Sequence, residues 1–181
     1  MMQIQKLYQQ AISYAAEKHA QNNQKIPGTN LPYVVHLSNV AMELFVASSA
    51  NDGLNMEFAV QVALLHDLIE DTDTTCEEIE DRFGVEIMNA VKALTKNNKL
   101  PKDQQLADSL IRIKKLQPEV WAVKLADRIT NLQPPPQHWD NEKIIQYQKE
   151  ARTIYDELKQ GNDFLANRLK QKIEEYSDYI K

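Results

Sequence analysis

Apolar side chains recur along most of the chain with the spacing of amphipathic helices. In residues 4–19 they return every three or four positions, which places them on one face of a helix. Polar segments with proline, glycine or asparagine separate such stretches, including a turn signal at Asn51, Asp52 and Gly53. The pattern predicts helices over residues 4–19, 34–50, 56–69, 75–83, 85–94, 103–116, 119–132, 141–159 and 163–180. We therefore expect an all-α fold, a single compact bundle of about eight or nine helices.

Residues 56–69 differ from the other segments because they are apolar on nearly every side. A helix of this kind lies in the middle of a bundle. Its C-terminal end nevertheless reads HDLIED, residues 66–71, with four ionisable side chains in six positions. An unpaired carboxylate costs several kcal/mol to bury, so a bound divalent cation is one explanation. A polar helix end in contact with solvent is the other.

Metal-ligating side chains occur in HDLIED and in two more segments of the chain. On a continuous helix, His66 and Asp67 both lie three or four positions before Glu70, so the three groups converge. His36 opens a predicted helix, and Asp127 directly follows an apolar run. Each has an ordinary explanation alone, as a helix-terminal histidine or an ion-paired aspartate. Together with the His-Asp pair they would form a set of two imidazoles and two carboxylates, which suits Mn²⁺, Fe²⁺, Co²⁺ or Zn²⁺.

Charge and composition limit the classes of function. The 21 Lys and Arg against 26 Asp and Glu give a net charge of −5, so neither nucleic acid nor a membrane is an expected partner. The single cysteine, Cys76, excludes an internal disulfide and a cysteine-based zinc cluster. It favours a reducing cytoplasm, and the sequence has no apolar run of the length of a signal peptide or membrane span. A length of 181 residues predicts one domain, residues 1–181.

Four segments carry a resemblance to a known family: PYVVHL, ALLHDLIEDTDTTCEEIEDRFG, LTKNNKLPK and VKLADRITNL. In this order they resemble the HD-domain phosphohydrolase superfamily. They are similar to the hydrolase domain of the RelA/SpoT enzymes, and closer still to the stand-alone small alarmone hydrolases, whose known animal member is the metazoan SpoT homologue. The motifs span residues 19–133, and weaker similarity covers the C-terminal helices, residues 140–181. The resemblance implies a single HD hydrolase domain.

The resemblance also implies a cofactor and a substrate. One Mn²⁺ would be held by two histidines and two aspartates: His36, His66, Asp67 and Asp127. The reaction of that family removes the 3′-pyrophosphate of the nucleotide ppGpp or pppGpp and releases GDP or GTP. The chemistry of a bound cation agrees, because it lowers the pKa of its water and polarises the attacked phosphoryl group.

Three further residues are candidates for catalysis. Glu70 and Asp71 closely follow the His-Asp pair and are expected outside the ligand set, where they would position or deprotonate the attacking water. Asn131 lies one helical turn after Asp127, so its amide faces the same site. We expect it to hold the water or a ribose-phosphate oxygen.

A substrate with several phosphates needs cations, which an acidic protein must supply locally. The resemblance places basic substrate contacts at Lys25 and Lys102 and an aromatic contact at Tyr147. Lys143 is a further candidate substrate contact. Five other basic residues are also candidates: Lys96, Lys99, Arg112, Lys124 and Arg128. An ordinary exposed position is the alternative for each lysine taken singly.

The loop before His36 departs from the family pattern. It reads HAQNNQKIPGTNLPY, one residue longer than in the animal hydrolase, and has Gln24 and Lys25 where the bifunctional enzymes use an arginine beside the guanine. Two alternatives therefore stay open. One is a phosphatase of another nucleotide, such as NADPH or a 3′-nucleotide. The other is a catalytically inactive nucleotide-binding or interaction module, which a lost metal ligand or a lost Glu-Asp pair would indicate; all of these residues are present.

Overall fold

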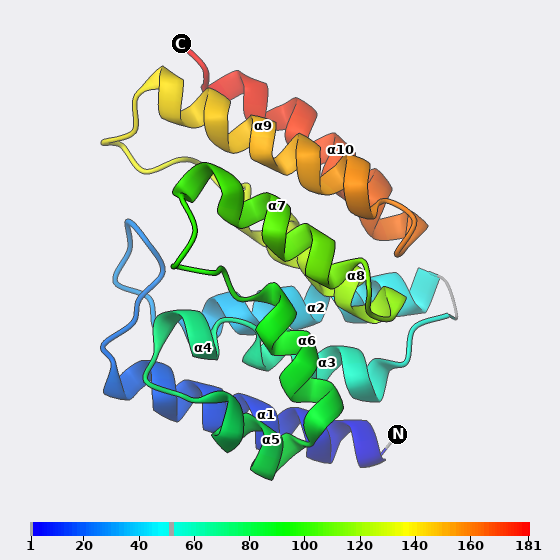
Figure 1. Cartoon of the computed structure of the whole chain (residues 1–181). Helices are drawn as coiled ribbons and strands as arrows, with labels where there is room; N and C mark the ends of the chain where they lie inside the picture. The colour runs from blue at the N-terminus through cyan, green and yellow to red at the C-terminus, as the bar shows by residue number, and fades with distance from the viewer. Residues whose placement is uncertain (1, 51–52) are drawn as a thin grey trace.

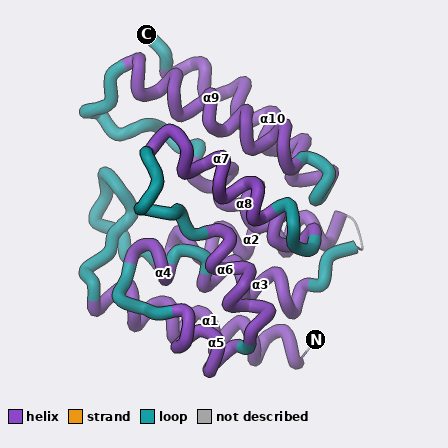
Figure 2. Tube along the Cα trace, viewed as in Figure 1, coloured by secondary structure: helices purple, strands orange, loops and turns teal. Residues whose placement is uncertain are grey.

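The computed structural model describes residues 2–50 and 53–181, and this part of the chain is helical without a strand (Figures 1 and 2). The turn predicted at Asn51 and Asp52 lies outside the described residues. Ten α-helices and a short 3-10 helix are described, with these bounds: α1 (Met2–Gln21), α2 (Val34–Ala50), α3 (Met56–Leu65), α4 (Leu68–Asp71), α5 (Cys76–Phe83), α6 (Val85–Leu94), α7 (Lys102–Ile113), α8 (Pro118–Asn131), α9 (Asn141–Leu158), α10 (Asp163–Glu175) and η1 (Tyr176–Tyr179). The predicted all-α fold is confirmed.

Helix α3 lies inside the bundle, as its apolar sequence predicts. It contacts α1, α2, α6 and α8, and most of its side chains are fully buried. The antiparallel pair α9 and α10 packs on α8 at one end of the molecule, and α1 and α5 lie at the opposite end (Figure 1). Although α3 is apolar, it has only ten residues. Among the described residues no helix is both long and apolar enough to span a bilayer.

The helix predicted over residues 56–69 is in fact divided, which raises the number of helices above the expected eight or nine. Helix α3 ends at Leu65 and α4 starts at Leu68, with His66 and Asp67 between them. The break lies at Asp67, whose angles of φ −99° and ψ 0° are outside the α-helical range. His66 keeps helical angles of φ −58° and ψ −31°. The sequence is apolar on both sides of the break, in Leu65 and in Leu68, so the apolar pattern hides it.

One further helix boundary agrees with the sequence prediction, and another differs from it. The hydroxyl of Thr75 accepts the N–H of Glu78 at 3.2 Å, and the Glu78 carboxylate accepts the N–H of Thr75 at 2.9 Å. This is the predicted capping box at the start of α5. The helix predicted over residues 163–180 ends earlier, at Glu175, where the last turn tightens into η1.

The turn between α9 and α10 depends on glycine. A Cβ atom at Gly161 would lie 2.5 Å from Cβ of Trp121 and 3.2 Å from the carbonyl oxygen of Leu158. Neither atom moves without its backbone, so Gly161→Ala should lower the free energy of unfolding by about 1–3 kcal/mol. Gly53→Ala is the matched control, because no atom lies within 4 Å of a Cβ there. Thermal unfolding of both variants tests this, and equal melting temperatures would contradict the close packing at Gly161.

Candidate metal centre

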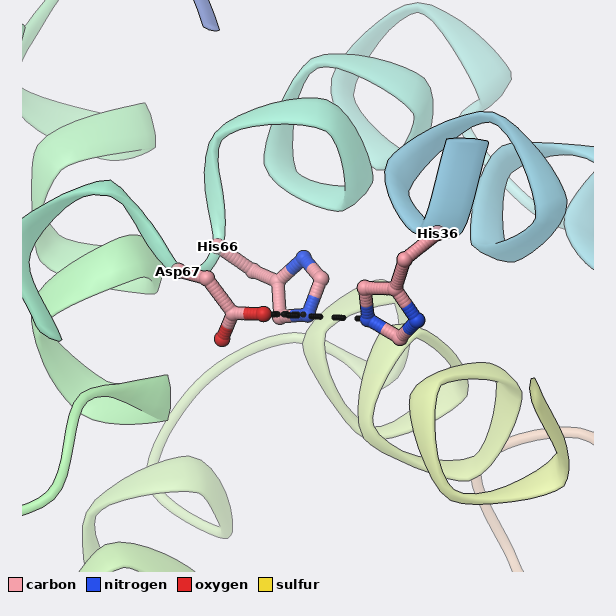
Figure 3. Close-up of side chains that lie close together, drawn as sticks. All are labelled: His36, His66 and Asp67. Atoms are coloured by element: carbon pink, nitrogen blue, oxygen red, sulfur yellow. Dashed lines mark ion pairs between the residues drawn. The ribbon is translucent and has the colours of Figure 1, made fainter. Parts of the chain in front are cut away.

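Four side chains from three separate parts of the sequence meet beside the break between α3 and α4. His36 comes from the first turn of α2, His66 and Asp67 from the break, and Asp127 from α8. Figure 3 shows the first three pointing toward one another. Oδ2 of Asp67 lies 3.0 Å from Nε2 of His66 and 3.7 Å from Nε2 of His36. Oδ1 of Asp127 lies 3.4 Å from Nε2 of His36 and 3.6 Å from Nε2 of His66.

One hydrogen bond fixes which nitrogen of His66 faces this cluster. Nδ1 of His66 lies 2.8 Å from the carbonyl oxygen of Ala63. A carbonyl oxygen only accepts hydrogen bonds, so Nδ1 carries a proton and Nε2 is left to bind a cation. Nε2 of His36 and Nε2 of His66 are both buried, and neither has a hydrogen-bond partner despite the nearby carboxylates. Orphaned nitrogens beside ionised oxygens fit a metal ion between them.

The donor atoms of this cluster also have separations that suit a metal. Ligands about 2.1 Å from a common ion lie roughly 3.0–3.4 Å apart. The four separations of 3.0 to 3.7 Å need only small adjustments to reach that range. Burial lowers the pKa of His66, but Asp67 and Asp127 raise it well above the ordinary value. A metal therefore competes with a proton at Nε2 of His66.

Asp127 is kept ionised by its neighbours on α8. Its Oδ2 accepts a hydrogen bond from the Lys124 ammonium at 3.0 Å, and its Oδ1 accepts one from the side-chain amide of Asn131 at 2.5 Å. Burial would raise the pKa of Asp127, but Lys124 and the two imidazoles hold it well below its usual range. Lys124, a candidate substrate cation by sequence, is therefore paired with a carboxylate of the cluster.

Asp67 has a comparable partner in Tyr33. The Tyr33 hydroxyl donates to Oδ2 of Asp67 at 2.5 Å. Burial and the Asp67 carboxylate raise the pKa of Tyr33, so its hydroxyl stays a donor. Burial would also raise the pKa of Asp67, but His66 beside it lowers that pKa below the ordinary value. Sequence reasoning missed Tyr33; its place three residues before His36 in PYVVH was the available signal.

A cleft of about 500 Å³ opens over this cluster. Most of the site residues predicted from sequence line it: Asp67, Glu70, Asp71, Lys102, Asp127, Asn131, Lys143 and Tyr147. Lys96, Lys124 and Arg128 line it as well. The cleft therefore brings carboxylates at the cluster together with cations on the surrounding walls.

Of the four predicted substrate contacts, Lys25 does not line the cleft, whereas Lys102, Lys143 and Tyr147 do. The Lys25 ammonium donates to the side chain of Asn30 at 3.3 Å, within its own loop, and its backbone forms a bridge with Pro32. The neighbouring Gln24 is turned inward. Its side-chain amide donates to the carbonyl oxygen of Asp71 at 2.9 Å, which ties the loop to the end of α4.

Arg112 also has a structural role away from the cleft wall. Its guanidinium donates to the carbonyl oxygen of Ala93 at 3.0 Å and to that of Thr95 at 2.8 Å, and it also bonds the carbonyl oxygen of Lys92. These carbonyls belong to the last turn of α6 and the residue after it, so Arg112 caps that helix. Its charge is complemented further by Asp108 at 2.8 Å.

The two acidic residues after the break differ in their surroundings. Burial, followed by the charges of Asp67 and Glu70, raises the pKa of Asp71 to about 6. A carboxylate that titrates near neutral pH is well matched to accept a proton from water. Glu70 instead bonds Lys96 and does not join the group of His36, His66 and Asp67, although a continuous helix would have placed it near His66.

Aromatic side chains form one wall of the cleft. The guanidinium of Arg128 lies over the ring of Tyr147, 4.3 Å from its centroid. The indole of Trp139 meets the same tyrosine edge-on, with centroids 5.1 Å apart. Sequence reasoning gave Trp139 no place in the site, because it follows a proline run without any periodic pattern. The wall offers stacking faces to a nucleobase.

An all-α bundle in which a buried helix breaks at a His-Asp pair, completed by a second histidine and a second aspartate, defines the HD-domain class of proteins. The chain belongs to the HD-domain family, whose model matches residues 11–169. Membership of this class implies a divalent metal, and His36, His66 and Asp67 form a candidate site for it.

Three individual proteins give a more specific comparison than the family model does. The guanosine-3′,5′-bis(diphosphate) 3′-pyrophosphohydrolase MESH1 of Xenopus tropicalis is 34% identical over 88% of this chain and 89% of its own length. A guanosine-3′,5′-bis(diphosphate) 3′-pyrophosphohydrolase of Aquifex aeolicus is 37% identical over 83% of this chain, which covers 20% of that longer protein. A solved structure of a metazoan orthologue of SpoT that hydrolyses ppGpp matches with a TM-score of 0.79 and 31% identity, over 93% of this chain and 94% of that one.

The raised pKa of Asp71 predicts a pH-dependent loss of stability. Folded Asp71 titrates near pH 6 and an unfolded aspartate near 3.9, so the folded protein binds more protons between these values. Stability is therefore lost as the pH rises through this interval. In protein stripped of metal with EDTA, Asp71→Asn should raise the free energy of unfolding at pH 8 by on the order of 1 kcal/mol after solvent screening.

The same substitution should bring a much smaller gain at pH 4, where the folded carboxyl is protonated and the unfolded one is about half protonated. Asp81→Asn, at an exposed position of α5, is the matched control and should change stability little at either pH. Chemical denaturation at both pH values measures the difference. A gain of the same size at pH 4 and pH 8 would rule out the titration of Asp71 as its cause.

Proposed function

We propose that this protein is a metal-dependent hydrolase that removes the 3′-pyrophosphate of ppGpp or pppGpp, with GDP or GTP and pyrophosphate as products. The observation that carries the proposal is the cluster of His36, His66, Asp67 and Asp127 at a cleft whose walls supply cations and stacking rings. The similarity to pyrophosphohydrolases of this specificity over most of the chain supports the same substrate.

The metal is Mn²⁺ in this proposal, held by two imidazole nitrogens and two carboxylate oxygens. Such a mixed set also accepts Fe²⁺, Co²⁺ or Zn²⁺, and it disfavours ions that prefer thiolates. When bound, the ion lowers the pKa of a water molecule and polarises the attacked phosphoryl group. The orphaned Nε2 atoms of His36 and His66 support this assignment.

Three polar residues near the metal cluster have separate roles around the attacking water. Asp71 accepts a proton from the water, since a pKa of about 6 leaves it ionised but still basic at neutral pH. Glu70 orients the same water. The amide of Asn131 donates to Asp127, so its oxygen is left to accept a hydrogen bond from the water or the substrate ribose.

Two kinds of side chain in the cleft bind the substrate: cations bind its phosphates, and aromatic rings bind its base. Lys102 and Lys143 neutralise phosphate oxygens, and they approach from α7 and α9 on different walls. Tyr147 and Trp139 form the aromatic wall against which the guanine packs. Burial raises the pKa of the Tyr147 hydroxyl, so Tyr147 brings no negative charge toward the phosphates.

A phosphatase of another nucleotide with a 2′- or 3′-phosphate, such as NADPH, is the second candidate. The observation that favours it is the loop before α2, where Lys25 turns away from the cleft and Gln24 is occupied by the Asp71 carbonyl. Neither residue lines the cleft in this arrangement, so discrimination for guanine is weaker. The metal cluster itself serves either substrate.

The proposal includes a single HD hydrolase domain over residues 1–181, with residues 19–133 as its motif-bearing core. Packing of α9 and α10 on α8 supports it, because the C-terminal helices share one hydrophobic core with the rest. We place the protein in the cytoplasm, where the free thiol of the partly exposed Cys76 stays reduced.

Product analysis tests the substrate directly. Protein loaded with Mn²⁺ is incubated in parallel with ppGpp, NADPH and a simple 3′-nucleotide, and released pyrophosphate and phosphate are quantified. A kcat/KM for ppGpp at least about a hundredfold above the others would correspond to almost 3 kcal/mol of discrimination and support the alarmone as substrate. Preference for NADPH or the 3′-nucleotide would select the second candidate, and no turnover with metal bound would overturn both.

The metal site has its own test. Asp67→Ala should remove the bound metal and the activity together, because one carboxylate ligand and a counter-charge for two imidazoles are lost. Asp73→Ala, a nearby exposed carboxylate, is the matched control and should retain both. Metal content by elemental analysis and turnover are measured on the same samples. Near-normal turnover in Asp67→Ala would remove this residue from the ligand set.

The two lysines implied by the resemblance should now behave differently. Lys102 lines the cleft, so Lys102→Ala should raise KM about tenfold through loss of a charge-assisted phosphate contact. Lys25 bonds Asn30 within its own loop, so Lys25→Ala should change KM by less than about twofold. Steady-state kinetics on the best substrate decides, and a larger effect at Lys25 would contradict the placement of the loop.

A further inference from the structure

Glu70 is held by Lys96 at two points. Its Oε2 accepts the backbone N–H of Lys96 at 3.0 Å, and its Oε1 accepts the Lys96 ammonium at 2.6 Å. The two residues are 26 positions apart, Glu70 in α4 and Lys96 in the segment after α6. Contact between α4 and α6 brings them together. Each oxygen of the carboxylate proposed to orient the water thus accepts one hydrogen bond from Lys96.

The two bonds differ in how easily they break. The N–H belongs to the backbone and stays where the chain places it. The ammonium stands at the end of a flexible chain that is 50% exposed, whereas the Glu70 side chain is only 21% exposed. The lysine head can therefore move while the backbone bond keeps the carboxylate in place.

Lys96 also lines the cleft in which the substrate phosphates are expected to bind. Asp71 and Tyr147 line the same cleft. Burial lowers the pKa of Lys96, but its hydrogen bond to Glu70 and the carboxylates of Asp67 and Asp127 raise it above its ordinary value. Lys96 is therefore a cation at neutral pH. A phosphate group with two negative charges competes with a single carboxylate for such a cation.

Resting on the function proposed above, we propose that Lys96 couples phosphate binding to the release of Glu70. In the empty cleft the ammonium occupies Oε1 of Glu70. When a phosphate or pyrophosphate group enters, the ammonium pairs with a phosphate oxygen, and Oε1 becomes free to accept a hydrogen bond from the attacking water. The backbone N–H keeps Oε2 fixed throughout, and no proton changes place. Lys96 is thus a positioning residue as well as a phosphate contact.

Steady-state kinetics distinguish this exchange from a permanent ion pair that only anchors Glu70. If the ammonium moves to phosphate, the saturated complex contains no bond between Lys96 and Glu70. Lys96→Met should then raise KM about tenfold and leave kcat within about threefold. Lys96→Arg, which keeps a cation, should restore KM to within about threefold of wild type. A permanent anchor would instead lower kcat at least tenfold in Lys96→Met with KM unchanged, and that result would overturn the proposal.

Lys99→Met is the matched control for these variants. Lys99, a candidate substrate cation by sequence, lies three residues further along the same segment. It is exposed and does not line the cleft, so the structure places it outside the proposed binding site. Its replacement removes one charge from the loop without touching Glu70. Both KM and kcat should therefore stay near the wild-type values. A rise in KM equal to that of Lys96→Met would trace the effect to the general charge of the loop and overturn the specific role of Lys96.

A second measurement does not depend on turnover. Melting temperatures of wild type, Lys96→Met, Glu70→Gln and the double variant are compared in Mn²⁺ buffer with and without saturating inorganic pyrophosphate. Without pyrophosphate the two losses should be non-additive, since each variant breaks the same pair. With pyrophosphate they should become additive. Non-additivity of the same size in both conditions would overturn the exchange, even if none of the nucleotides tested is hydrolysed.

Discussion

Burial of two carboxylates beside two imidazoles is the constraint on which the rest of this site depends. Asp67 and Asp127 lose most of their contact with water, and each is compensated by a fixed donor, Tyr33 for the first and Lys124 for the second. The imidazole of His66 is turned by a backbone carbonyl so that Nε2 faces the carboxylates. These contacts concentrate negative charge at one point inside a helical bundle, where a cation completes the balance.

The helical framework and the candidate ligands could be predicted from the sequence, because both leave a local trace. Amphipathic periods mark the helices, and polar residues inside an apolar helix mark the cluster at His66 and Asp67. The break at Asp67 leaves no trace, since apolar residues continue on both sides of it. The all-α fold is confirmed, whereas the roles of individual site residues remain predictions.

What the sequence does not reveal depends on contacts between distant segments. No pattern connects Glu70 to Lys96, which are brought together only by the packing of α4 on α6. Arg112 and Lys124 look like equivalent candidate cations along the chain, yet one caps a helix and the other neutralises an aspartate. The position of Lys25 depends on how its loop closes, which composition and spacing leave undetermined.

The hydrogen bond from the side chain of Gln24 to the carbonyl of Asp71 links the loop before α2 to the end of α4. The loop that carries Gln24 connects α1 to α2, while the end of α4 carries acidic groups proposed for the chemistry. Because one amide joins them, a lineage that remodels this loop to accept a new base also shifts the backbone behind those groups. Substrate range and catalytic efficiency in such a protein would then evolve together.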